Sequence, residues 1–244
     1  MHGNILDRFR LTNRTALVTG AHRGIGRAIA LALSGAGARL AIHHAGTEEE
    51  EADAASVVHE IEQSGGAARA FGQDFSLADA GHRLAETVSA WSPIDILVLN
   101  AAALGTLSQV SAFDPKEVAK VLALNVSAQA ALIGAFDGLL RKSDAGRVIG
   151  LTSKVGRQPR AYWGLYGATK AAFENLLLSY ADEVRNLTKV RVALLDPGAT
   201  RTKMRARAYP GEAPESVKPP EEVAERIVAM LAQDFETGGF EALG

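Results

Sequence analysis

Short apolar runs alternate along the chain with longer amphipathic stretches. Runs of β-branched and aliphatic residues predict strands, whereas apolar positions recurring every three to four residues predict helices. The predicted strands are residues 15–19, 39–43, 69–72, 94–100, 147–152, 190–195 and 240–242. The predicted helices are residues 24–34, 48–64, 77–91, 115–141, 167–186 and 220–232, and residues 199–219, rich in proline, glycine and charge, are expected to form a loop.

This alternation predicts an α/β fold with a doubly wound parallel sheet of the Rossmann type. Residues 94–100 read IDILVLN, a nearly continuous apolar run typical of a strand that is covered on both faces. Strands that alternate with helices favour a parallel sheet of about seven strands with helices on both faces. We expect one domain over residues 1–244, with its ligand beyond the carboxyl ends of the strands.

A glycine-rich turn follows the first predicted strand and opens the first helix. Its glycines are Gly20, Gly24 and Gly26, and His22, Arg23 and Ile25 lie between them. Such a turn lets a pyrophosphate approach the backbone N–H groups of a helix N-terminus. The spacing G-x-x-x-G-x-G does not match the common dinucleotide fingerprint G-x-G-x-x-G literally, so an ordinary strand–helix turn is the alternative.

The end of the second strand indicates the type of dinucleotide. NAD enzymes usually place an acidic residue there, but this chain has His43 and His44 and no acid before Glu48. The missing acid, with Arg23 nearby, favours NADP(H) over NAD(H). Adjacent strand residues point to opposite sides, so we expect His44 alone to face the cofactor and expect no metal site.

Tyr166 and Lys170 are the first candidates for catalysis. Four residues apart at the start of a predicted helix, they share one face. A lysine cation beside a phenol in a closed cleft lowers the phenol's pKa and suits it to proton transfer. Ser153 follows the strand at 147–152, where its hydroxyl would reach a substrate oxygen. A chance pair and a simple turn serine are the alternatives.

Composition excludes several classes of function. The chain has no cysteine, so it has neither disulfides nor thiol nucleophiles, and its net charge of −2 gives no sign of nucleic-acid binding. Residues 1–15 lack the apolar stretch of a secretory signal, and no apolar run reaches the ~18 residues of a membrane span. We therefore expect a cytoplasmic protein. The cations of the 199–219 loop are expected to be solvated; they are Arg201, Lys203, Arg205 and Arg207.

In this order and at these separations, the motifs resemble the short-chain dehydrogenase/reductase family, in particular members similar to 3-oxoacyl-acyl-carrier-protein reductases. The resemblance covers nearly the whole chain. It implies that Tyr166 is the acid/base, that Lys170 lowers its pKa and holds the nicotinamide ribose, and that Ser153 orients the substrate oxygen. It adds Asn125 as the holder of a proton-relay water. Further cofactor contacts implied by the resemblance are Asp74, Phe75, Asn100, Ala101, Pro197, Gly198, Thr200 and Thr202.

The sequence departs from the family pattern at three positions. Leu99 and Ala102 replace the first Asn and the Gly of an N-N-A-G segment, and Asp196 before Pro197 is unusual. We expect the first two to change loop packing without loss of cofactor.

The substrate is expected to be a small carbonyl or alcohol compound, and the resemblance does not choose among ketones, β-ketoacyl groups, sugars and polyols. Residues 154–165 and 199–219 would select it. The first segment offers Arg157, Arg160, Tyr162 and Trp163, for which surface or interface roles are equally open. The resemblance also implies a homodimer or homotetramer. A non-catalytic NADP-binding sensor and an epimerase or dehydratase on the same fold remain the alternative functions.

Overall fold

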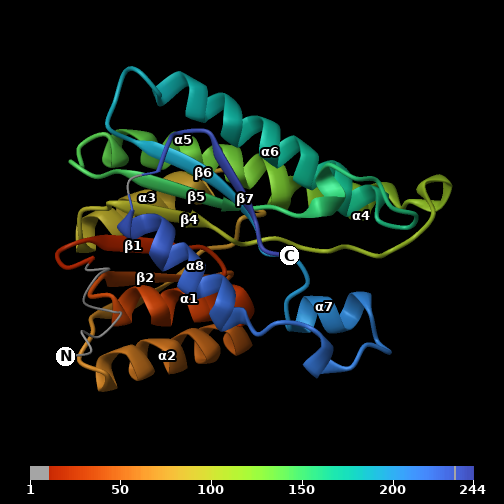
Figure 1. Cartoon of the computed structure of the whole chain (residues 1–244), viewed down its shortest axis with the longest axis horizontal. Helices are drawn as coiled ribbons and strands as arrows, with labels where there is room; N and C mark the ends of the chain where they lie inside the picture. The colour runs from red at the N-terminus through yellow and green to blue at the C-terminus, as the bar shows by residue number, and fades with distance from the viewer. Residues whose placement is uncertain (1–10, 234) are drawn as a thin grey trace.

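The structure, a computed structural model, describes residues 11–233 and 235–244, and a seven-stranded parallel sheet forms its centre (Figure 1). The strand order is β3-β2-β1-β4-β5-β6-β7, with every neighbouring pair parallel. The strands are β1 (Thr15–Val18), β2 (Arg39–His44), β3 (Ala68–Gly72), β4 (Ile96–Leu99), β5 (Arg147–Leu151), β6 (Arg191–Asp196) and β7 (Gly239–Ala242). The predicted fold class is confirmed. The part of the signal-sequence prediction that concerns residues 1–10 lies outside the described residues.

Helices cover both faces of this sheet (Figure 1). Successive strand residues face opposite layers: Ala16 and Val18 of β1 belong to one core, whereas Leu17 belongs to the other. The first core includes side chains of α1 (Gly24–Gly35), α2 (Glu48–Gln63) and α8 (Pro220–Ala232). The second includes those of α3 (Ala80–Trp91), α5 (Ala128–Leu140) and α6 (Gly164–Val184).

The long helix predicted at 115–141 is interrupted by a π-helical turn. It begins as α4 (Pro115–Leu122), where Asp114 is the N-cap and accepts a hydrogen bond from the backbone N–H of Lys116. The π-helical turn Ala123–Ser127 follows, and α5 continues the helix. The sequence showed no apolar run long enough for a membrane span, but an 18-residue stretch within the 26-residue helical segment Pro115–Leu140 has a mean hydropathy of 1.5, which is enough by length and composition. The core helices of soluble proteins pass the same test.

Two further differences from the sequence prediction concern segments near the site. The segment 199–219 is not only loop, because it contains α7 (Lys203–Ala208) and a 3-10 turn at Pro214–Ser216. The Thr202 side chain caps α7 by accepting from the backbone N–H of Arg205, a local signal that the density of proline and glycine obscured. In addition, α6 begins at Gly164 rather than 167, which places Tyr166 inside its first turn.

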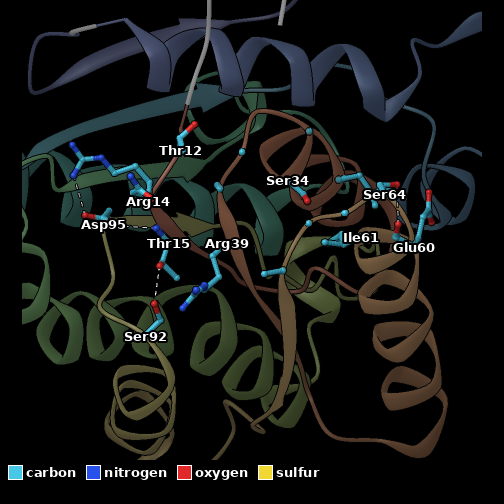
Figure 2. A pocket seen from close by; sticks show the side chains of 18 of the residues that line it. Thr12, Arg14, Thr15, Ser34, Arg39, Glu60, Ile61, Ser64, Ser92 and Asp95 are labelled. Atoms are coloured by element: carbon cyan, nitrogen blue, oxygen red, sulfur yellow. Dashed lines mark hydrogen bonds and ion pairs between the residues drawn. The ribbon is translucent and has the colours of Figure 1, made fainter. Parts of the chain in front are cut away.

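A cavity of about 660 Å³ lies at the amino ends of the strands, away from the expected site (Figure 2). Its polar groups bond to one another: Arg14 pairs with Asp95 at 3.2 Å, and the hydroxyl oxygens of Thr15 and Ser92 are 2.9 Å apart. Asp95 also accepts a hydrogen bond from the backbone N–H of Thr15. This cavity therefore has a structural network and none of the predicted catalytic residues.

Candidate active site

The strand register gathers the predicted site residues at the carboxyl edge of the sheet. Leu99 of β4 pairs with Gly150, and Leu151 of β5 pairs with Leu195 of β6. The residues that follow these adjacent strands therefore begin loops at one edge. They are Asn100, Ser153 and Pro197, and the glycine-rich turn joins them after β1.

The glycine-rich turn leaves space at the N-terminus of α1. Gly20 and Gly24 have φ angles of 61° and 56°, a region that favours glycine. A Cβ on Gly26 would lie 2.3 Å from the Gly20 carbonyl oxygen and 2.6 Å from Asn100 Nδ2. No side chain caps α1 at Arg23, so the first N–H groups of the helix are available to an anion.

Thr19, which the sequence analysis did not single out, ties this turn to the loop after β4. Its Oγ1 accepts hydrogen bonds from the backbone N–H groups of Asn100 and Ala101, at 2.9 and 3.0 Å. The Asn100 side chain donates in return to the Thr19 carbonyl oxygen at 2.8 Å. Asn100 therefore keeps its place despite the replacements at Leu99 and Ala102. In the sequence, the signal for this contact is the threonine directly before the first glycine of the turn.

His43 supports the same turn from β2. It is buried, its Nδ1 accepts from the backbone N–H of Gly20 at 3.1 Å, and its Nε2 donates to the Gln73 carbonyl oxygen at 2.9 Å. Its ring stacks on Phe75, with centroids 4.1 Å apart. The Phe75 side chain thus packs on protein. His44, the histidine assigned to the cofactor, is also buried, and its Nδ1 accepts from the backbone N–H of Gly46.

Burial lowers the pKa of His43 from 6.5 to about 3, and this predicts acid sensitivity. The unfolded chain binds a proton at this residue below pH 6.5, whereas the folded chain does not until about pH 3, so stability is complete above pH 6.5 and falls as the pH drops through this window. The free energy of unfolding, measured in urea between pH 4 and 7.5, should fall less steeply with decreasing pH in His43→Gln than in the wild type. We expect the difference in slope to be about 1 kcal/mol per pH unit. The exposed His82→Gln is the control. An unchanged slope in His43→Gln would contradict the prediction.

His22, a predicted cofactor contact in the glycine-rich turn, has an acid beside it. His22 is buried, and neither ring nitrogen has a hydrogen-bond partner in the described part of the chain. Its Nε2 is 3.6 Å from Glu50, whose carboxylate accepts from the backbone N–H of Ala45 at 2.8 Å. The sequence has no acidic residue between the end of β2 and Glu48. However, α2 folds so that the Glu50 carboxylate lies beside the glycine-rich turn. The Glu50 carboxylate would repel a phosphate at this position, whereas the exposed Arg23 guanidinium would attract one.

Tyr166 and Lys170 lie in the first two turns of α6 and are both buried. Lys170 Nζ donates to the carbonyl oxygen of Leu151, the last residue of β5, at 2.9 Å, and lies 5.7 Å from the centre of the Tyr166 ring. Ser153 follows β5 by one further residue. The structure therefore brings the predicted pair to the strand end that carries the serine.

The electrostatics of the pair differ from the sequence-based expectation. Burial raises the pKa of the Tyr166 phenol, and the Asp196 carboxylate raises it further, so the phenol is neutral and suited to donate a proton. Burial also lowers the pKa of Lys170 to about 8, against the opposing effects of Glu174 and Asp196. Burial therefore outweighs the lowering of the phenol's pKa that the sequence predicted.

Asn125 lies in the π-helical turn and is buried. Its Oδ1 accepts from the backbone N–H of Ala103, and its Nδ2 donates to the carbonyl oxygen of Ala103 and to Thr169 Oγ1. The side chain thus joins the loop after β4 to α6, one residue before Lys170. Its role in a proton relay stays a prediction.

The loop after β6 packs against the glycine-rich turn. Of the residues predicted to contact the cofactor, Thr202 lies at this turn, whereas the Thr200 and Asp74 side chains bond within their own loops. The Thr202 methyl is 3.6 Å from the position of a Cβ on Gly24. Thr200 is buried, and its hydroxyl donates to the Pro197 carbonyl oxygen at 3.2 Å, so this side chain serves the loop. Asp74 is exposed and caps its own turn by accepting from the backbone N–H of Ser76.

An aromatic row extends from Tyr166 along the segment expected to select the substrate. The Trp163 ring lies 6.0 Å from that of Tyr166 and 5.8 Å from that of Tyr209. Arg160 Nη1 donates to the Tyr209 hydroxyl at 2.5 Å. Arg205 pairs with Glu212, contrary to the expectation of a solvated cation, whereas Arg201, Lys203 and Arg207 are exposed.

Comparison with known proteins identifies one family. Residues 14–213 match the family model described as short chain dehydrogenase. The chain is 36% identical over 227 residues to the uncharacterized oxidoreductase YciK of Escherichia coli K12, covering 92% of this chain and 88% of that protein.

Solved structures agree over nearly the whole chain. A short chain dehydrogenase of Pseudomonas syringae superposes with a TM-score of 0.90 at 33% identity, covering 96% of each chain. Another from Shigella flexneri 2a, solved in complex with NADP, gives a TM-score of 0.89 at 34% identity, covering 96% of this chain and 98% of that one.

Proposed function

The chain belongs to the short chain dehydrogenase family of oxidoreductases, and we propose that it transfers hydride between NADP(H) and a small carbonyl or alcohol compound. The observation that carries this proposal is the buried Tyr166–Lys170 pair, held by α6 against the end of β5 where Ser153 emerges. A neutral phenol in a closed site is the group that a developing alkoxide needs as a proton donor.

The residues around the glycine-rich turn fit a dinucleotide. Gly26 has no room for a Cβ, and the N-terminus of α1, which the Arg23 side chain does not cap, suits a pyrophosphate. Arg23 and the unsatisfied ring nitrogens of His22 suit the 2′-phosphate. A relative solved with NADP supports the choice of NADP(H). When bound, the cofactor supplies the hydride at the nicotinamide carbon.

Three side chains would carry the proton chemistry. We assign to Ser153 the orientation of the substrate oxygen and to Tyr166 the proton transfer to that oxygen during reduction, or from it during oxidation. Lys170 would hold the nicotinamide ribose after exchanging its present bond to the Leu151 carbonyl for one to the ribose. Asn125 would keep a relay water near Lys170, through the loop and helix that it joins.

We also propose that residues 1–244 act as one domain and assemble as a homo-oligomer. Only a third of the 18-residue apolar stretch within Pro115–Leu140 is buried by the described part of the chain. A second copy of the chain would cover more of it. The cytoplasmic location expected from the sequence stays a prediction.

Titration of the purified protein with NADPH and NADH, followed by nicotinamide fluorescence, tests the cofactor assignment. We expect tighter binding of NADPH, and we expect Arg23→Ala to weaken NADPH about tenfold while NADH changes little, because the guanidinium would face only the 2′-phosphate. The exposed Arg83→Ala in α3 is the control. Equal losses for both cofactors would contradict the contact, and a preference for NADH would give Glu50 the greater weight.

A carbonyl screen with NADPH then tests the reaction. Oxidation of NADPH that requires both a carbonyl compound and the protein would support the oxidoreductase proposal. Tight NADPH binding without turnover on any ketone, β-ketoester or sugar would favour a sensor instead.

A further inference from the structure

Two buried carboxylates lie beside Lys170, and the proposed mechanism uses neither. Glu174 is one helical turn after Lys170 in α6 and is 8% exposed, whereas Asp196, the last residue of β6, is 4% exposed. Acidic side chains are almost never so buried unless they are paired. The two acids beside the candidate proton-transfer pair must therefore have partners that balance their charge.

Arg157 pairs with both. Its Nη1 is 2.5 Å from Glu174 Oε1, and its Nη2 is 2.6 Å from Asp196 Oδ2. The guanidinium also lies over the Phe240 ring of β7, 4.0 Å from its centre. The planar fork of the arginine lets two separate nitrogens of one cation bond the two acids.

Neutral donors complete the bonding of the two acids. Thr152 Oγ1 donates to Glu174 Oε1, and the backbone N–H of Gly198 donates to Asp196 Oδ1 at 3.0 Å. Two ionised acids and one guanidinium leave one net negative charge beside the Lys170 ammonium.

This charge acts on the groups proposed to move protons. Glu174 and Asp196 each raise the pKa of Lys170, which burial lowers to about 8, and Asp196 also raises the pKa of Tyr166. Lys170 thus faces Glu174 on its own helix, Asp196 at the end of β6 and the neutral phenol of Tyr166. Arg157 faces the two acids rather than Lys170, so it acts through them.

We propose that Glu174, with Asp196, supplies the local charge that keeps Lys170 an ammonium during turnover, and that Arg157 bridges the two acids and offsets part of that charge. Glu174 and Arg157 are therefore positioning residues. The catalytic meaning of this inference rests on the proposed function. The alternative is a clamp that only holds the end of β6 to α6. A clamp predicts that neutralising Glu174 changes stability but leaves the titration of Lys170 unchanged.

Carbon-13 NMR of the lysine Cε groups, recorded from pH 6 to 10.5 without cofactor or substrate, separates these readings. The Lys170 resonance is the one absent in Lys170→Met. We expect Glu174→Gln to lower its titration midpoint by about one pH unit, because a negative charge one helical turn away is lost. Glu183→Gln, which neutralises an exposed carboxylate of the same helix, should leave the midpoint in place.

Arg157→Met provides the opposite change. It removes the cation from the two acids, so the Lys170 midpoint should rise. An unmoved midpoint in Glu174→Gln overturns the proposal, whether or not Arg157→Met folds, and a fall in folded Arg157→Met overturns the role of Arg157. Because this readout needs neither NADPH nor a substrate, it can fail while wild-type turnover stands, and it can succeed if the proposed reaction fails.

Discussion

Tyr166→Phe is expected to lower kcat by about 10²- to 10⁴-fold while NADPH binding changes little. The substitution keeps the ring that packs beside Trp163 and removes only the hydroxyl. Loss of a positioned general acid costs about this much in rate. The measurement is steady-state NADPH oxidation with the carbonyl compound found by screening, alongside a fluorescence titration of NADPH.

Tyr180→Phe is the matched control for this experiment. It removes another buried phenol hydroxyl from the same helix, one that donates to Asp137 at 2.8 Å far from the site. We expect a stability loss of about 1 kcal/mol and unchanged kcat. Turnover by Tyr166→Phe at the wild-type rate would remove Tyr166 from the proposed mechanism.

The second large effect is expected from Gly26→Ala. The new methyl group would lie 2.3 Å from the Gly20 carbonyl oxygen and 2.6 Å from Asn100 Nδ2, so the turn or the loop after β4 must move. We expect a loss of about 2–4 kcal/mol in the free energy of unfolding. NADPH affinity should fall by more than about tenfold, because the same backbone would approach the pyrophosphate.

Gly35→Ala tests whether that effect is local. Gly35 ends the same helix, and no atom of the described residues lies within 4 Å of its Cβ position. Alanine there should be neutral or stabilising by up to about 1 kcal/mol, since it restricts the unfolded chain. The measurements are denaturant unfolding and NADPH titration of both variants. Equal losses of stability and of NADPH affinity in the two variants would contradict the steric argument.

Local patterns were enough to predict the sheet and the order of the motifs. The apolar run before Asn100 and the strand before Ser153 both end at the edge where the sequence placed the site. Glycine spacing located the turn, because the φ angles of Gly20 and Gly24 lie in a region that favours glycine. These features depend on a few neighbouring residues, which a single sequence shows directly.

The features that the sequence did not reveal depend on residues distant along the chain. The contact between Glu50 and His22 exists only because α2 returns to the turn, and the bridge from Arg157 to Asp196 spans 39 positions. The pKa of Tyr166 was expected to fall, but its burial and the neighbouring Asp196 raise it. Burial and long-range charge follow from tertiary packing, so spacing alone predicted the catalytic pair but not its electrostatics.

The π-helical turn at Ala123–Ser127 also changes which sides of one long helix are inward. In this turn the backbone N–H of Ala128 bonds to the carbonyl oxygen of Ala123, five positions earlier, so the helix carries one extra residue. One residue rotates everything after it by about 100° around the helix axis. The rotation lets α4 pack against α6 while α5 packs against α3. Deleting a single residue here would therefore restore a regular helix and present the wrong side of α5 to the core.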